Sequence, residues 1–270
     1  MKKEKTGYGF YIGIGITSVM LTLIIIGYFV TPYGAEDMNG AVKLVPPSFS
    51  HLFGTDQFGR DIFSRVLKGA GNTVFIALGT LFIGGGIGVL VGMFTGYFGS
   101  WLDEILMRIS DMLASFPGVF LALILVSILG AGRNNVMVIL GIVFIPSYAR
   151  IVRGEVYRCK EEDYVKRAKL LGASNIRIML VHILPNIVPA LFSALLIGFN
   201  NTIIAEAGLS YLGIGVQPPE ASLGRMLSEA QGYITTGPWY VIFPGIFIIV
   251  LVLGVSLLEN GILERFGGGR

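Results

Sequence analysis

The sequence predicts an all-α membrane protein that crosses the bilayer about six times. The chain has 270 residues, of which 53% are hydrophobic and only 14% are charged, and its mean hydropathy is +0.74. A water-soluble domain of this size would need far more charge to cover its surface. Six windows hold roughly 20 mostly apolar residues, enough for a helix to cross about 30 Å of hydrocarbon. The net charge of +3 is too small to indicate nucleic-acid binding.

The predicted spans are residues 10–30, 73–97, 104–129, 136–152, 187–208 and 240–258. The first follows a charged start but is too long for the apolar core of a signal peptide, so we interpret it as a retained helix. The third carries Arg108 and Asp111 and is interrupted by Pro117. The fourth is short, and we expect it to end near Pro146.

Orientation is predicted from Lys and Arg, which accumulate on the cytoplasmic side of membrane proteins. With the N-terminus inside, 14 basic residues fall in cytoplasmic segments and 6 in outside segments. Both termini are therefore expected in the cytoplasm. We divide the chain into residues 1–72 (first span and first outside loop), 73–260 (core membrane domain) and 261–270 (cytoplasmic tail).

One inside loop, residues 153–185, has a pattern of its own. From residue 164 onward, its apolar residues recur at helical spacing. Gly172 supplies a left-handed turn position, Ser174 is a suitable N-cap, and Pro185 would end the second helix. The loop therefore predicts a rigid helical hairpin in the cytosol, of the kind a soluble motor needs in order to move the spans. Its seven Lys and Arg residues would also suit anionic lipid headgroups.

Four polar residues in or near the spans are candidates for a translocation pathway: Asp111, Asn200, Asn201 and Glu206. A charged group at a helix centre costs about 2.5–3.5 kcal/mol on insertion scales, so it should be paired or face water. Asp111 could instead pair with Arg108 at i, i+3 spacing. The asparagines would line a pathway or join helices. Glu206 lies at the outer end of its span, where a loop contact is cheap.

No motif indicates catalysis or metal binding. The glycine run at 84–88 lies in an apolar span with no Lys-Ser/Thr after it, so close helix packing explains it better than a phosphate loop does. His51 and His182 are expected on opposite sides of the membrane, and Cys159 is near neither. We expect no metal site, no cofactor and no catalytic residue. If ATP drives this protein, another subunit hydrolyses it.

The inner loop resembles the EAA loop of bacterial ABC-importer permeases, whose pattern is Glu-Ala-Ala, three residues, Gly, nine residues and Ile-x-Leu-Pro. The matching positions hold Ala168, Gly172, Leu184 and Pro185, and the departures are Lys166, Arg167 and His182. The resemblance implies that this loop docks onto an ATPase. The residues it assigns to coupling are Ala168, Lys169, Leu171, Gly172, Ala173, Ser174 and Pro185.

Further blocks resemble the dipeptide/oligopeptide/nickel permeases, in the subunit usually called the C-type. They are Phe-Gly-Thr-Asp-Gln-Phe-Gly-Arg-Asp (53–61), the segments 108–111 and 115–117, and the segments 206–213 and 218–224. The first block is an outside segment for which we expect a binding-protein contact or a gating role. The residues concerned are Gly54, Asp56, Gly59, Arg60 and Asp61.

This family implies a type I ABC-importer-like transmembrane domain in the bacterial plasma membrane. The implied partners are a second permease subunit in a heterodimer, two cytoplasmic ATPase subunits that carry ATP and Mg, an extracytoplasmic binding protein, and membrane lipid. Di- or oligopeptides are the favoured substrate, and nickel or a metal chelate is the alternative. A stand-alone secondary transporter or channel is a more distant alternative, which would usually show internal repeats or paired intramembrane charges.

Overall fold

The computed structural model describes residues 8–267, with side chains through residue 263. Basic residues of the orientation argument that lie outside the described residues are Lys2, Lys3, Lys5 and Arg270, together with the side chain of Arg265. The described chain forms helices and loops, with one isolated antiparallel bridge between Thr55 and Asp61.

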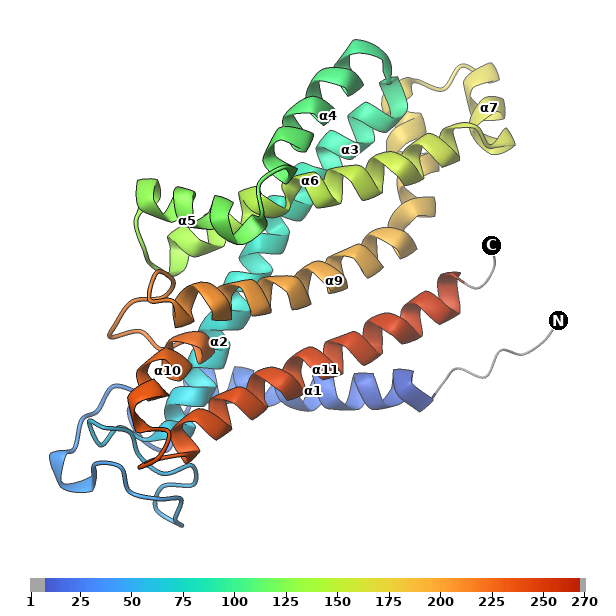
Figure 1. The fold of residues 1–270 in the computed structure, drawn as a ribbon. Coiled ribbons are helices and arrows are strands. Elements are labelled where there is room, and N and C mark those ends of the chain that lie inside the picture. The colour runs from blue at the N-terminus through green and yellow to red at the C-terminus, as the bar shows by residue number, and fades with distance from the viewer. Residues whose placement is uncertain (1–7, 268–270) are drawn as a thin grey trace. The chain divides into compact units, whose positions relative to one another are not determined.

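The helices follow one another along the chain, as Figure 1 shows. The α-helices within the described residues are α1 Tyr8–Phe29, α2 Ile62–Thr80, α3 Gly86–Phe98, α4 Ser100–Ala114, α5 Gly118–Leu129, α6 Arg133–Lys160, α7 Asp163–Leu170, α8 Asn175–Arg177, α9 Leu184–Tyr211, α10 Leu223–Ala230 and α11 Trp239–Gly267. Two π-helical segments, η2 Leu81–Gly85 and η3 Ile178–Ile183, connect α2 to α3 and α8 to α9. Two 3-10 turns are η1 Gly40–Val42 and η4 Gln231–Tyr233.

Five helical stretches of the described chain are long and apolar enough to cross a membrane, and a sixth span results if α4 and α5 act together. The prediction of a helical membrane protein with about six spans is confirmed. The third predicted window, however, is not one straight helix, because α4 and α5 meet at an angle of 90°. The break falls at residues 115–117, where Pro117 lacks the N–H that a continuing helix requires.

Two predicted helix ends at proline were wrong. Helix α6 continues through Pro146 over 28 residues, and Pro185 lies in the first turn of α9 instead of ending a helix. A span tolerates an internal proline because neighbouring helices and local adjustments satisfy the freed carbonyl. Helix α9 follows directly on η3, so the helix runs on from Asn175 to Tyr211.

The chain folds as two compact units. Unit 1 contains Met1–Leu78, Val126–Met137 and Asn200–Arg270, and unit 2 contains Gly79–Leu125 and Val138–Phe199. The division of the chain at residues 72 and 260 stays a prediction.

In unit 1, α1 and α11 pack closely as an antiparallel pair (Figure 1). A Cβ atom at Gly13 would lie 2.5 Å from the Leu258 backbone nitrogen, and one at Gly261 would lie 2.6 Å from the Phe10 side chain. Only glycine allows helix axes to come this close. Because early positions of α1 meet late positions of α11, the start of α1 and the end of α11 lie at the same end of the pair.

In unit 2, α3 packs on α6 through glycines at four-residue spacing. A Cβ at Gly92 would lie 2.6 Å from the carbonyl oxygen of Ala149, and one at Gly96 would lie 2.8 Å from that of Arg153. Contact positions rise together on the two helices, so α3 and α6 run parallel. The glycine run contributes in the same way, since a Cβ at Gly84 would lie 2.6 Å from a backbone oxygen of α6. Its interpretation as a packing element agrees with the structure.

Candidate functional site: the inner loop and the outer ion-pair cluster

The inner loop of unit 2 turns sharply after α7. Helix α7 ends at Leu170, and Gly172 takes a φ of +81°, which costs glycine no steric strain. The hydroxyl of Ser174 accepts a hydrogen bond from the Arg177 N–H at 3.4 Å and caps α8. The predicted turn glycine and N-cap are therefore confirmed.

One face of α7 anchors the loop. Val165 and Ala168, three residues apart, are buried against α6 and η3. Their neighbours in this apolar cluster include Val156, Cys159, Ile178, Met179 and Ile183, with Ala173 packed against the edge. Ala168 thus serves the fold of the loop and has little surface to offer a partner.

The tip of the loop is apolar and exposed. Leu170 and Leu171 are each 87% exposed. Leu171 was expected on the same face as Ala168, but the helix ends one residue earlier and the side chain turns outward. Leu170 was not among the predicted site residues, although the Leu-Leu pair directly before the turn glycine could have indicated it. Gly172 and Ser174 are also exposed, and a Cβ at Gly172 would meet nothing within 4 Å.

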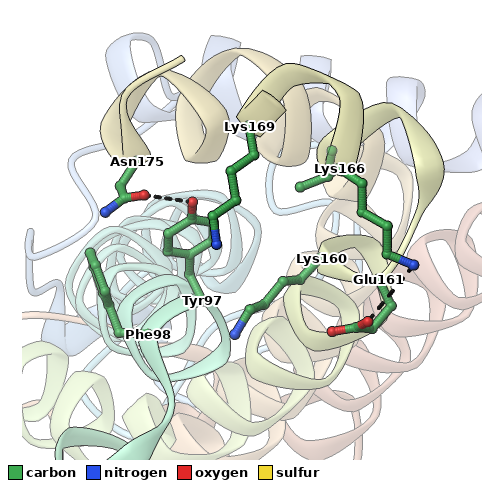
Figure 2. A pocket seen from close by; sticks show the side chains of 8 residues that line it. Tyr97, Phe98, Lys160, Glu161, Lys166, Lys169 and Asn175 are labelled. Atoms are coloured by element: carbon green, nitrogen blue, oxygen red, sulfur yellow. Dashed lines mark hydrogen bonds and ion pairs between the residues drawn. The ribbon is translucent and has the colours of Figure 1, made fainter. Parts of the chain in front are cut away.

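A cavity of about 390 Å³ lies beside α7 (Figure 2). Its lining residues are Tyr97, Phe98, Lys160, Glu161, Val165, Lys166, Lys169 and Asn175. The Tyr97 hydroxyl donates a hydrogen bond to Asn175 Oδ1 at 2.9 Å. Figure 2 shows the side chain of Lys169 reaching toward Tyr97, so this predicted coupling residue belongs to the cavity wall.

Asp111 is part of an ion-pair contact between α4 and α6. Arg150 Nη2 donates to Asp111 Oδ1 at 2.7 Å, and both side chains are mostly exposed. The expected pairing of Asp111 with Arg108 was wrong, because Arg108 pairs with Glu104 at 2.6 Å. Glu104 lies four residues before Arg108 on the same face of α4, so the two side chains can pair within one helix.

Glu206, in unit 1, is completely buried. The Thr73 hydroxyl donates to its Oε2 at 2.8 Å, and the Ser210 hydroxyl donates to its Oε1 at 2.6 Å. We expected a cheap loop contact at the outer end of the span, and Glu206 does bond to Ser210 and Ser222 of the predicted outside loop, although its side chain is buried. Through Thr73 it also joins α2 to α9.

The two asparagines differ from each other. Asn200 is buried, and its amide group donates to the Ser256 hydroxyl of α11 at 3.0 Å. Its Oδ1 has no hydrogen-bond partner within the part of the chain that the structure describes. Asn201 is exposed.

The outer ion-pair cluster, also in unit 1, consists of Asp56, Arg60, Arg65, Glu229 and Tyr240. Arg60 Nε donates to Asp56 Oδ2 at 2.6 Å, and its Nη2 donates to Glu229 Oε2 at 3.0 Å. Arg65 Nη2 and the Tyr240 hydroxyl converge on the same Glu229 oxygen at 3.2 and 2.9 Å. These contacts connect the loop before α2 to α10 and to the start of α11. Sequence reasoning missed Arg65, which lies just after the motif, and Glu229 and Tyr240, which lie far from it in the chain.

Neighbouring charges set the direction in which the pKa values of Glu229 and Arg60, two cluster residues outside the candidate spans, are shifted. Burial by itself raises the pKa of Glu229, but the positive charges of Arg65 and Arg60 and the hydrogen bond from Tyr240 outweigh it, so the pKa lies below its ordinary value. Burial lowers the pKa of Arg60, but the charge of Asp56 and the hydrogen bond to it, together with the charges of Glu229 and Tyr240, outweigh burial, so the pKa lies above its ordinary value. Both groups are therefore charged at neutral pH.

The predicted outer residues shape the loop from within. Gly54 and Gly59 take φ values of +75° and +74°. Asp61 accepts hydrogen bonds at 2.8 Å from the N–H and hydroxyl of Ser64 and so caps α2. Its Oδ1 lies 2.9 Å from His51 Nδ1.

The outer loop exposes apolar side chains beside charged ones. Asp56, Arg60 and Asp61 are buried, whereas Phe49, Leu52 and Phe58 are exposed, as are Glu36, Asp37 and Lys43 earlier in the loop. A partner that approaches the part around Phe49, Leu52 and Phe58 would therefore meet aromatic and aliphatic side chains.

Within the described residues, no group of three or more His, Cys, Asp or Glu side chains is placed to hold a metal ion. The long apolar helices, and the helical loop between two of them, define a membrane component with several spans.

Comparison with known proteins identifies the family. Residues 88–266 match the model for the inner membrane component of binding-protein-dependent transport systems, and the chain belongs to this family. The dipeptide transport system permease protein of Alkalihalophilus pseudofirmus is 35% identical over 266 residues, covering 98% of this chain and 86% of that protein. The glutathione transport system permease protein of Escherichia coli O157:H7 is 39% identical over 247 residues, covering 91% and 82%. The dipeptide permease protein of Haemophilus influenzae is 34% identical, covering 96% and 90%.

A solved structure shares the fold. A chain of the methionine ABC transporter MetNI, in an inward-facing conformation, superposes with a TM-score of 0.62 at 20% identity, covering 74% of this chain and 95% of that chain. The predicted family and the type I importer-like fold are thus confirmed. The chain is a multi-pass translocation subunit of the bacterial inner membrane, not an enzyme. Its family works together with ATPase subunits, further permease subunits and a binding protein.

Proposed function

We propose that this chain is one half of the membrane channel of an ATP-driven importer for di- or oligopeptides. It pairs with a second, different permease subunit, and two cytoplasmic ATPase subunits supply the energy with ATP and Mg. An extracytoplasmic binding protein delivers the substrate. Alone, the chain transports nothing. The peptide class is supported by relatives that are named for dipeptide and glutathione transport. Family membership favours this importer over a stand-alone secondary transporter or channel.

The single observation that carries the proposal is the exposed Leu170–Leu171 tip on an anchored helix. Val165 and Ala168 fix α7 against α6 and η3, so a force on the tip passes into helices that continue as spans. Water-exposed leucines gain free energy when a protein groove covers them, about 1.5–3 kcal/mol each on full burial. The tip therefore docks in a groove of an ATPase subunit. In this orientation of the chain, both termini lie in the cytoplasm.

Closure of the two ATPases around ATP would move this anchored loop and switch the spans between inward-open and outward-open states. Among the residues that the structure describes, Asn200 has a buried acceptor without a partner, which suits a polar position on the substrate pathway. Asp111, Asn201 and Glu206 are weaker pathway candidates, because Asp111 is ion-paired, Asn201 is exposed and Glu206 is fully bonded within unit 1. On the outside, Phe49, Leu52 and Phe58 would contact the binding protein, and the segment from Gly54 to Asp61 would hold them in place.

The test exploits the positive φ of Gly172. Valine at this position is strained, whereas asparagine tolerates left-handed backbone. In proteoliposomes with the complete importer, we expect Gly172→Val to lower peptide uptake per ATP hydrolysed severalfold. Gly172→Asn should retain most of the coupling. Equal coupling in the Val variant and the wild type would overturn the role of this turn.

A further inference from the structure

The cavity beside α7 has an excess of positive charge. Three lysines line it, and its one acidic residue, Glu161, lies 4.0 Å from Lys166 Nζ. Within the described part of the chain, neither Lys160 nor Lys169 has a carboxylate within 4.0 Å. The Lys160 amino group instead lies 5.9 Å from the centre of the Tyr97 ring. In Figure 2, Lys160 and Lys169 extend from different elements toward Tyr97, while Lys166 turns toward Glu161.

The cavity has the size and the donors for a phosphate ester. Its 390 Å³ would hold about a dozen waters at about 30 Å³ each, so a phosphate with its glycerol fits. A lysine ammonium offers three N–H donors and no acceptor. Asn175 adds its amide N–H groups, because its Oδ1 already accepts from Tyr97. The chemistry that this wall recognises is an anionic oxygen cluster.

The neighbouring surface is apolar and follows a span. Phe98 lines the cavity and stacks on Phe94 one helical turn back along α3, with ring centres 6.0 Å apart. Both rings are nearly half exposed, at 44% and 43%. Since Ile62–Phe98 is a candidate span that ends at this cavity, the rings extend from its basic wall toward the hydrocarbon region. A soluble anion would leave these rings uncovered, whereas an acyl chain would cover them.

We propose that the cavity formed by the ends of α3 and α6 with α7 and α8 binds the headgroup of an anionic phospholipid, whose acyl chains lie on Phe98 and Phe94. Basic pockets at the cytoplasmic ends of spans are suited to anionic headgroups. The bound lipid connects α7, which carries the docking tip, to the ends of two spans. The position of the loop, and with it the coupling to the ATPase, then depends on the anionic lipid content of the membrane.

The experiment is native mass spectrometry of the full chain in detergent with added lipids. The probes are dioleoyl phosphatidylglycerol, dioleoyl phosphatidylcholine, glycerophosphoglycerol and inorganic phosphate. The test variant is Lys160→Gln/Lys169→Gln. The matched control is Arg158→Gln/Arg167→Gln, which removes two positive charges from the same helices, α6 and α7, at residues outside the cavity lining. The variant Lys160→Arg/Lys169→Arg retains the charge.

We expect phosphatidylglycerol to bind the wild type better than phosphatidylcholine does. At about fivefold per lysine near a membrane surface, the Gln pair at 160 and 169 should weaken phosphatidylglycerol binding about 30-fold. The Arg pair and the control pair should stay within about threefold of the wild type. If the far-UV CD spectrum of the Gln pair is identical to that of the wild type, a loss of lipid binding reflects the cavity and not misfolding. The Arg pair, which keeps both positive charges, provides a second control for folding.

Three results would overturn the proposal. One is an equal loss in the test and control pairs, which would indicate diffuse attraction to the whole loop. Another is binding of glycerophosphoglycerol or phosphate as tight as that of the lipid, which would indicate a soluble anion. The third is a Gln pair that binds lipid normally but no longer binds the ATPase subunit, which would make the cavity a protein contact. Because the lipid measurement contains no ATPase, its failure leaves the proposed importer function standing.

Discussion

Removal of the apolar tip should separate ATPase docking from folding. Leu170 and Leu171 are each 87% exposed, so in the isolated chain neither stabilises the fold. Replacement of either by serine should change the free energy of unfolding by less than about 0.5 kcal/mol. If an ATPase groove covers both side chains, each serine removes about 2 kcal/mol of binding free energy, a factor of about 30 in Kd.

The two effects should combine to weaken docking by about 10²- to 10³-fold, since adjacent contacts at an interface are rarely additive. The assay is titration of the purified ATPase subunit onto the permease in nanodiscs, followed by biolayer interferometry. Leu170→Met/Leu171→Met is the matched control, because methionine preserves apolar area and volume. A Kd for the Ser pair within threefold of the wild type would refute the reasoning, as would a Met pair as weak as the Ser pair.

Two further predictions concern the frame around these sites. Glu229→Gln removes the carboxylate 3.2 Å from the buried Arg65 guanidinium and should destabilise the outer loop by about 3 kcal/mol, measurable as faster proteolysis there. The pKa of Glu229 is lower in the folded state than its ordinary value of 4.5. Its contribution to stability is therefore complete above pH 4.5 and is lost as the pH falls through the lower folded pKa. The protease resistance of the wild type should fall in that pH window, and a profile that stays flat would contradict this. Gly92→Leu would force a Cβ to within 2.6 Å of the Ala149 carbonyl oxygen and should destabilise unit 2 by about 1–3 kcal/mol, seen as a lower Tm in detergent. Gly154→Leu, on the open side of α6, is the control, and an equal Tm for the two variants would count against close α3–α6 packing.

Features set by local sequence were predictable. Apolar length located the spans, and the turn at Gly172 and the cap at Ser174 follow from the conformational freedom of glycine and the hydroxyl of serine. The glycine run in the second span was correctly interpreted as a packing surface, because close helix approach needs nothing more than small residues.

Features that depend on tertiary neighbours were not predictable. Whether a proline such as Pro146 bends a helix or ends it depends on its neighbours. In this apolar span, α6 continues past Pro146. Glu206 and Asp111 found partners on other helices, at sequence distances that no spacing rule covers. The outer motif was recognised, but its charged side chains are buried, and a sequence motif does not indicate whether its side chains are buried or exposed.

The central claim is that the tip of the inner loop lies against an ATPase, and site-directed cross-linking tests it most directly. The one native cysteine, Cys159, is buried, so a cysteine introduced at Leu171 should react selectively. In the assembled importer, Leu171→Cys should cross-link to an ATPase subunit through a short bismaleimide, with a yield that changes when ATP is added. Ile234→Cys, an exposed position in the loop predicted to lie outside, should not. A Leu171→Cys chain that reacts with free maleimide but never cross-links to the ATPase would contradict the account.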